Sequence, residues 1–106
     1  MHVADGGFSL GELEFTWDAA KNLTNTRKHG VAFEEAATTW LDDLAIEVFD
    51  EEHSTDEDRW IRLGRSLRGA LVVTWWTVRS ERGEVIRIIG ARRATRTEKR
   101  LYEAYR

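Results

Sequence analysis

The chain has 106 residues, a length that fits one hydrophobic core and excludes a core plus a second domain. It contains no cysteine, which excludes a disulfide framework, a thiolate metal site and a cysteine nucleophile. The net charge is only −3, but residues 1–58 carry three basic side chains against fifteen acidic ones, whereas residues 59–106 carry thirteen against four. Such asymmetry indicates a surface that binds a polyanion.

The first segment, residues 1–12, is rich in small, polar and acidic side chains, and we expect it to be a flexible tail. It lacks the basic start and the apolar run of a secretory signal peptide. The remaining residues, 13–106, are expected to form a single domain, and their apolar runs are too short to cross a membrane. The sequence therefore predicts a cytoplasmic protein.

Two helices are predicted after a first short strand at residues 13–17. Asp18 is a good N-cap for a helix over residues 18–29, and Gly30 follows in the position where a left-handed residue commonly ends a helix. A second helix is indicated by an apolar stripe at helical spacing, made by Phe33, Ala36, Ala37, Trp40 and Leu41. Ala32 precedes it, so the usual side-chain cap is absent, at a cost of about 1 kcal/mol.

The hydrophobic period changes to two beyond residue 45, which predicts four strands over residues 45–50, 59–66, 71–79 and 84–92. Short connections between them indicate antiparallel pairing. Thr95 then begins a last helix, with Glu98 three residues later completing a capping box. The predicted order is β-α-α-β-β-β-β-α, an α+β domain in which helices flank a twisted antiparallel sheet.

Several phrases of the sequence, in this order and spacing, resemble the BrnT family of toxins. They are Phe15–Lys21, Asn25–Val31, Phe33–Ala36, His53–Ser54, Arg59–Ser66, Arg68–Gly69, Ile86–Thr95, Glu98–Arg100 and Tyr102–Glu103. The resemblance implies a fold like that of RelE-type ribonucleases and an activity as an endoribonuclease. It also implies a BrnA-type ribbon-helix-helix antitoxin as partner in a heterotetramer. In that complex only the antitoxin contacts operator DNA.

The chemistry expected from that resemblance needs no cofactor and no metal, because RNA supplies its own nucleophile, the 2′-hydroxyl. The three histidines, at positions 2, 29 and 53, have no metal-ligand spacing, and we predict no metal site. The basic half is arginine-rich, with twelve arginines among its thirteen cations, and arginine binds phosphate in a planar, bidentate way.

Arg65 and Arg92 are the strongest candidates for stabilising charge on the scissile phosphate. Strand parity puts Arg65 on one face with Ile61 and Leu63, and puts Arg92 on one face with Ile86 and Ile88. An arginine that continues an apolar face at a strand end suggests the rim of a cleft. The alternative is a buried ion pair with one of the many acids.

His29 and Tyr102 are candidates for proton transfer. His29 can instead complement the dipole at the end of its helix, and Tyr102 can instead pack against the sheet. The residues predicted to bind RNA are Lys28, Arg79, Arg93 and Arg96. Two other functions stay open from the sequence: a nucleic-acid-binding module without catalysis, and an interaction subunit whose tryptophan-bearing face completes a partner.

Overall fold

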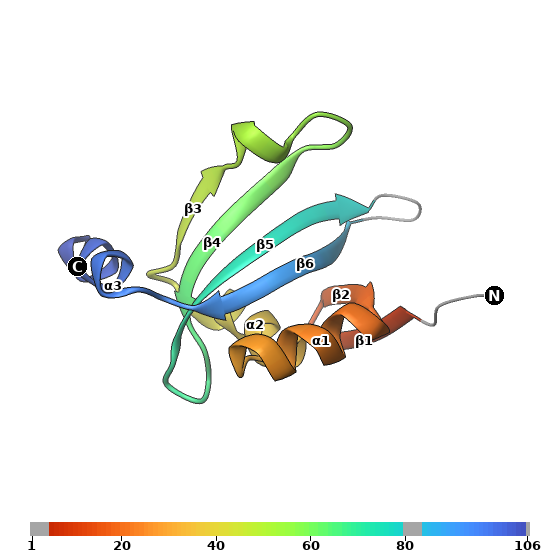
Figure 1. The fold of residues 1–106 in the computed structure, drawn as a ribbon, viewed down its shortest axis with the longest axis horizontal. Helices are drawn as coiled ribbons and strands as arrows, with labels where there is room; N and C mark the ends of the chain where they lie inside the picture. The colour runs from red at the N-terminus through yellow and green to blue at the C-terminus, as the bar shows by residue number, and fades with distance from the viewer. Residues whose placement is uncertain (1–4, 80–83, 106) are drawn as a thin grey trace.

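The computed structural model describes residues 5–79 and 84–105, which form a mixed α+β domain built on one six-stranded sheet (Figure 1). The strands are β1 (Asp5–Leu10), β2 (Leu13–Asp18), β3 (Ile46–Phe49), β4 (Arg59–Arg65), β5 (Leu71–Arg79) and β6 (Val85–Arg93), and their order in the sheet is β1-β2-β6-β5-β4-β3. The helices are α1 (Ala19–His29), α2 (Phe33–Ala37) and α3 (Arg96–Ala104), with 3-10 turns η1 (Thr38–Leu41) and η2 (Glu51–His53). None of the described helices is long and apolar enough to span a membrane.

The N-terminal segment differs from the predicted flexible tail, because residues 5–10 form the edge strand β1. This strand pairs antiparallel with β2 in a register that sets Phe8 opposite Phe15, and the turn between the strands contains Gly11 at a positive φ of 59°. Phe8 and Leu10 pack against the core, and this packing explains why the segment is ordered. Residues 1–4, also predicted as tail, lie outside the described residues.

The sequence predicted a wholly antiparallel sheet. The sheet is instead mixed, because β2 pairs parallel with β6. The remaining ladders, β1–β2, β3–β4, β4–β5 and β5–β6, are antiparallel as expected. The parallel pairing covers only Glu14–Thr16 against Val85–Arg87. Beyond it the chain leaves the sheet and enters α1, whose Asn25 amide hydrogen-bonds both the N–H and the carbonyl of Ala91 in β6. The side chain of Asn25 therefore replaces a neighbouring strand at that edge.

Helix boundaries follow the predicted capping residues closely. The Asp18 carboxylate accepts the N–H of Lys21 at the start of α1, and Gly30 ends the helix at a φ of 70°. The predicted second helix is shorter: after Ala37 the chain tightens into η1. Ala32 makes no side-chain cap, but the Asn22 side chain accepts the N–H of Phe33 in its place. Thr95 and Glu98 form the expected capping box of α3.

A β-bulge decides which side chains point to which face of the sheet. Trp75 pairs with Gly90 and Trp76 pairs with Ile88, so Ile89 is the extra residue. The inner face, covered by α2, holds the larger core of Phe15, Trp17, Phe33, Val72, Trp76, Ile86 and Ile88. The outer face holds a smaller core of Leu63, Leu71, Val73 and the α3 residue Tyr102. Figure 1 shows α3 at one end of the sheet, away from α1 and α2.

Candidate functional site

Among the residues that the structure describes, five arginines lie on the outer face of the sheet: Arg59, Arg65, Arg79, Arg87 and Arg92. The strand registers set their positions, since Arg59 pairs with Thr77 and Thr77 pairs with Arg87, which makes one row across three strands. Side chains directly opposite one another in a ladder share a face. Arg79 lies two residues beyond Thr77, while Arg65 and Arg92 lie at the α3 end. The basic half of the sequence is thereby concentrated on one side of the sheet.

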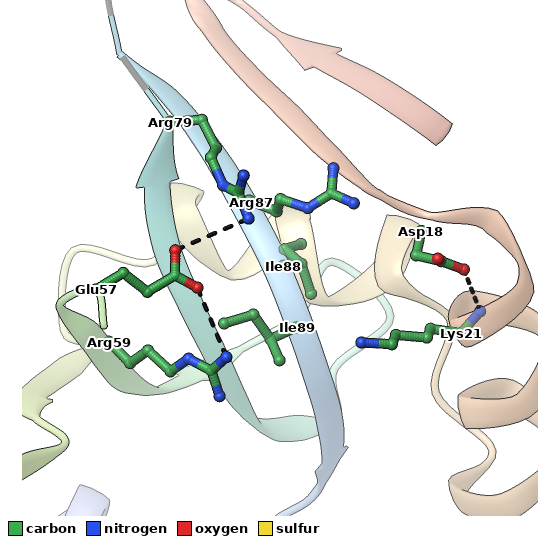
Figure 2. Close-up of a pocket in the computed structure, with 8 residues that line it drawn as sticks. All are labelled: Asp18, Lys21, Glu57, Arg59, Arg79, Arg87, Ile88 and Ile89. Atoms are coloured by element: carbon green, nitrogen blue, oxygen red, sulfur yellow. Dashed lines mark hydrogen bonds and ion pairs between the residues drawn. The ribbon is translucent and has the colours of Figure 1, made fainter. Parts of the chain in front are cut away.

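A cavity of about 140 Å³ on this face, here called the arginine pocket, is lined by Asp18, Lys21, Glu57, Arg59, Arg79, Arg87, Ile88 and Ile89 (Figure 2). Glu57 stands between two of the arginines, with one oxygen 3.6 Å from a terminal nitrogen of Arg59 and the other 3.8 Å from one of Arg79. These distances exceed those of a direct hydrogen bond. The two guanidinium groups are therefore held loosely and can take another anion.

Of the predicted RNA-binding residues, Arg79 lies in the arginine pocket and Lys28 lies next to it. A second cavity, of about 350 Å³, is lined by Lys28 and His29 of α1 and shares Lys21 and Ile89 with the arginine pocket. The candidate His29 is half-buried at the end of α1, on a separate element from Arg65 and Tyr102.

Arg92 lies on the outer face, opposite to the face predicted from strand parity. Ile86 and Ile88 belong to the inner core, whereas Arg92 pairs with Val73 of the outer core. The bulge inserts Ile89 as one extra residue in β6. Side chains after it therefore lie on the face opposite to the one that strict alternation predicts. For the same reason Arg87 lies on the outer face, whereas Arg93 pairs with Val72 of the inner core.

The guanidinium of Arg92 contacts Glu98, Trp75 and the carbonyl of Arg93, to which it donates at 3.2 Å. It makes two hydrogen bonds to the Glu98 carboxylate, of 2.7 and 2.8 Å, and lies 5.3 Å from the centroid of a Trp75 ring. The hydrogen bonds from Arg92 lower the pKa of Glu98 from its ordinary 4.5 to about 2, and those to Glu98 raise the pKa of Arg92. The ion pair named as an alternative for this residue is therefore present, and it is only partly buried.

Arg65 and Tyr102 lie together as two of the predicted catalytic residues. Arg65 shares its face with Ile61 and Leu63, as the strand parity predicted, and its guanidinium lies 5.5 Å from the centroid of the Tyr102 ring. Tyr102 is only 2% exposed, and its hydroxyl donates to Asp42, which also accepts the backbone N–H of Arg65. Burial works to raise the pKa of Asp42, but these hydrogen bonds hold it below its ordinary value.

The structure separates the predicted residues into three groups. Arg65 and Tyr102 form one, Arg92 with Glu98 a second, and Lys28, His29 and Arg79 lie around the two cavities. Arg96 is exposed at the start of α3. Three lining residues that sequence reasoning did not single out, Glu57, Arg59 and Arg87, form the centre of the arginine pocket. For Arg59 and Arg87 the signal was present as polar residues alternating with apolar ones along β4 and β6, whereas Glu57 precedes β4 and has no such signal.

The comparison with protein families decides which kind of protein this is. A family model described as the ribonuclease toxin BrnT of type II toxin–antitoxin systems matches residues 17–98. The chain belongs to the BrnT family. A search of curated proteins finds no match.

The matched range runs from the end of β2 into the first turn of α3 and includes all five arginines of the outer face. As a member of the BrnT family, the chain is a ribonuclease toxin of a type II toxin–antitoxin system, which implies an RNA substrate and an antitoxin partner. Within residues 5–79 and 84–105, no three His, Asp or Glu side chains are grouped to hold a metal ion.

Proposed function

We propose that this BrnT protein is an endoribonuclease that cleaves RNA on the outer face of its sheet without a metal ion. The observation that carries the proposal is the group of Arg59, Arg79 and Arg87 around the arginine pocket: Glu57 lies 3.6 Å from Arg59 and 3.8 Å from Arg79, beyond a direct hydrogen bond, and Arg87 is paired with Asp5 at 3.2 Å. Guanidinium groups match the bidentate geometry of a phosphodiester. An RNA backbone bound there continues along the same face toward Arg92 and Arg65.

In this proposal Arg65 and Arg92 stabilise the charge that develops on the phosphate oxygens when the 2′-hydroxyl attacks. Arg92 is held in place by Glu98 and Trp75, so its guanidinium needs no reorganisation when charge develops. Tyr102 is buried and already donates to Asp42, so we assign it to positioning Arg65 rather than to proton transfer. Arg96, exposed at the start of α3, contacts the RNA backbone farther along, whereas Arg93 lies on the inner face and is given no RNA contact in this proposal.

A BrnA-type ribbon-helix-helix antitoxin is the proposed partner, and it inhibits the toxin by covering the outer face. A heterotetramer with two copies of each chain satisfies the two-fold symmetry of a ribbon-helix-helix dimer, and operator DNA is contacted through the antitoxin. We place the complex in the cytoplasm, where messenger RNA is accessible. Arginine and tryptophan side chains, such as those at positions 92 and 75, are also frequent anchors of protein interfaces.

The test is incubation of the purified chain with RNA in EDTA, followed by end-group analysis of the fragments. Attack by the 2′-hydroxyl leaves a 2′,3′-cyclic phosphate or a 3′-phosphate on one fragment and a 5′-hydroxyl on the other. Arg92→Ala should remain folded and cleave about 100-fold more slowly. Arg68→Ala, in the exposed β4–β5 turn and outside both cavities, is the matched control and should cleave normally.

Three outcomes would contradict parts of the proposal. Cleavage that EDTA abolishes and Mg²⁺ restores would overturn metal independence. Normal cleavage by Arg92→Ala with a lowered melting temperature would make Arg92 a structural partner of Glu98. RNA binding without cleavage by the wild-type chain would leave a nucleic-acid-binding module without catalysis.

A further inference from the structure

The two edge strands of the sheet differ in the side chains that they expose. Along β1 the exposed positions are Asp5, Gly7 and Ser9, and the apolar side chains at the alternate positions pack against the core. Along β3, Val48 is 52% exposed and Phe49 is 40% exposed. Proteins commonly protect an edge strand with polar side chains, because an unpaired edge readily accepts a further strand. Of the two edges, β3 is therefore the one that is open to an added strand.

The backbone of β3 also presents groups that can pair with such a strand. Among the described strands β3 is the last in the sheet order, and it pairs with β4 alone. Directly after β3, the N–H of Asp50 donates to the carbonyl of Arg59 at 2.9 Å. Backbone groups of an antiparallel strand point alternately toward and away from its partner, so those of Glu47 and Phe49 point away from β4. Their N–H and carbonyl groups face an incoming strand.

An apolar groove lies beside this edge, on the outer face between β3 and α3. Ile46 and Val48 line it from β3, and Leu101, which is 47% exposed, lines it from α3, around a cavity of about 210 Å³. The exposed cations of α3, Lys99 and Arg100, do not line this cavity. A strand added to β3 directs every second side chain to the outer face, where the groove can receive an apolar one.

The charge at this edge determines which kind of molecule can occupy it. Residues 42–52, which include β3, contain six acidic side chains and no lysine or arginine. Asp43, Glu51 and Glu52 are exposed at the two ends of β3, and no cation among the described residues forms an ion pair with them. These acids repel the phosphates of RNA and the same acids of a second copy of the chain, whereas they attract a basic strand.

We propose that β3 and the groove beside it bind an extended, basic segment of the antitoxin, which adds to the sheet as a further strand; this rests on the proposed function, which supplies the partner. The segment has apolar side chains at alternate positions for the groove, and lysine or arginine at its ends for the exposed acids. Glu98, which also lines the groove, hydrogen-bonds Arg92. The docked strand therefore lies next to the outer-face arginines, which the adjoining part of the antitoxin covers.

Hydrogen exchange tests the added strand directly. In the complex with the purified cognate BrnA-type antitoxin, the amides of Glu47 and Phe49 should exchange about 10-fold or more slowly than in the free chain, because a partner carbonyl accepts each of them. The edge strand β1 is the internal control and should exchange equally in both samples. A complex that forms without any change at Glu47 and Phe49 would overturn docking at this edge.

A substitution at Val48 tests the groove. Val48→Lys places a cation in an apolar wall, so it should weaken antitoxin affinity about 10-fold or more. Its melting temperature and its RNA cleavage should not change, because the side chain is more than half exposed and contacts no outer-face arginine. Leu67→Lys, which replaces a 71% exposed leucine in the β4–β5 turn, is the matched control and should bind normally. Equal affinities of the two variants would overturn the role of the groove.

Charge reversal tests the basic character of the segment. Glu51→Lys combined with Glu52→Lys should weaken binding at low salt, and the loss should shrink at high salt, because salt screens exposed charges. Glu12→Lys combined with Glu14→Lys, at the opposite edge of the sheet, is the matched control and should bind normally. An antitoxin whose docking cations are changed to glutamate should recover affinity for the first variant. An affinity that neither reversal changes would rule out a basic segment.

The outcomes separate this inference from the proposed function. If the antitoxin inhibits cleavage yet binds Val48→Lys and the Glu51 and Glu52 variant at full strength, docking at β3 is overturned and the inhibited ribonuclease remains. If the wild-type chain does not cleave RNA but the antitoxin protects Glu47 and Phe49, the catalytic proposal fails and the docking site stands. Protection of these amides by RNA, or in the chain alone at high concentration, would assign the edge to RNA or to a second copy.

Discussion

Around Arg92, the partly buried ion pair with Glu98 couples the stability of the protein to pH. Because the folded pKa of Glu98, about 2, lies below its ordinary value of 4.5, the carboxylate stabilises the fold at pH values above 4.5. As pH falls from 4.5 through 2, the carboxylate takes up a proton and that contribution is lost. Glu98 also closes the capping box of α3, so one side chain holds both the helix start and the guanidinium.

Glu98→Gln should reduce the free energy of unfolding at pH 7 by roughly 1–3 kcal/mol, the usual range for a hydrogen bond to a charged group. Glutamine keeps an acceptor for the capping box, so the variant removes mainly the charge. Urea denaturation at a series of pH values measures the effect. The difference between wild type and variant should shrink as pH falls below 4.5; a difference that stays constant down to pH 2 would contradict the assigned pKa.

Single residues show where sequence reasoning succeeds and where it stops. Arg65 was placed on its correct face by the alternation of β4, which has no irregularity. Arg92 was placed on the wrong face, because a period of two cannot reveal the extra residue Ile89.

Among the elements, the β1–β2 hairpin is the one that sequence patterning missed. After Asp5, the strand β1 has two glycines, which lower strand propensity and hide the alternation of Phe8 and Leu10. Gly6 has a packing reason to be glycine, because a Cβ there would lie 2.7 Å from Cδ1 of Trp17 and would overlap its indole ring. The other strands and the longer helices were predicted to within a few residues, because caps and turns mark their ends.

Gly6→Ala should destabilise the protein by about 1–3 kcal/mol, since Trp17 is 2% exposed and cannot move aside without repacking the core. Gly7→Ala is the matched control in the same strand: its Cβ would meet only the carbonyl oxygen of Phe15, at an ordinary 3.5 Å. Thermal unfolding followed by tryptophan fluorescence compares the two. Equal melting temperatures for both variants would mean that β1 does not pack against Trp17 in solution.

Across the whole molecule, charge is arranged so that a nearly neutral protein presents a basic face. Thirteen of its sixteen basic residues lie from position 59 onward, and among those that the structure describes, Arg59, Arg65, Arg79, Arg87 and Arg92 lie on the outer face. This distribution was readable from the sequence, but the pocket that it builds was not, since Arg59, Arg79 and Arg87 come from three different strands. The registers of the strand ladders bring these three side chains together.

RNA affinity should fall steeply with salt, because each phosphate neutralised on a single strand contributes a slope of about −0.7 to log K against log salt. Arg79→Ala should weaken binding and reduce that slope by about 0.7, while Arg68→Ala should leave the slope unchanged. Fluorescence anisotropy with labelled single-stranded RNA between low and moderate salt measures both. An affinity that does not change with salt would exclude the arginine pocket as the binding site.

The position of β6 has a consequence for the timing of synthesis. This strand is the last of the six to be made, yet it lies between β2 and β5 and joins the two parts of the sheet. Until it emerges from the ribosome, the β1–β2 hairpin has no neighbour in the sheet and α1 has no edge to cover, and such distant pairings form late in folding. A BrnT chain that is still being translated therefore lacks both its finished sheet and two of its outer-face arginines, Arg87 and Arg92. In the cell, the nuclease therefore becomes active only after the chain is released from the ribosome. Antitoxin that is already present has the whole period of translation before active toxin forms.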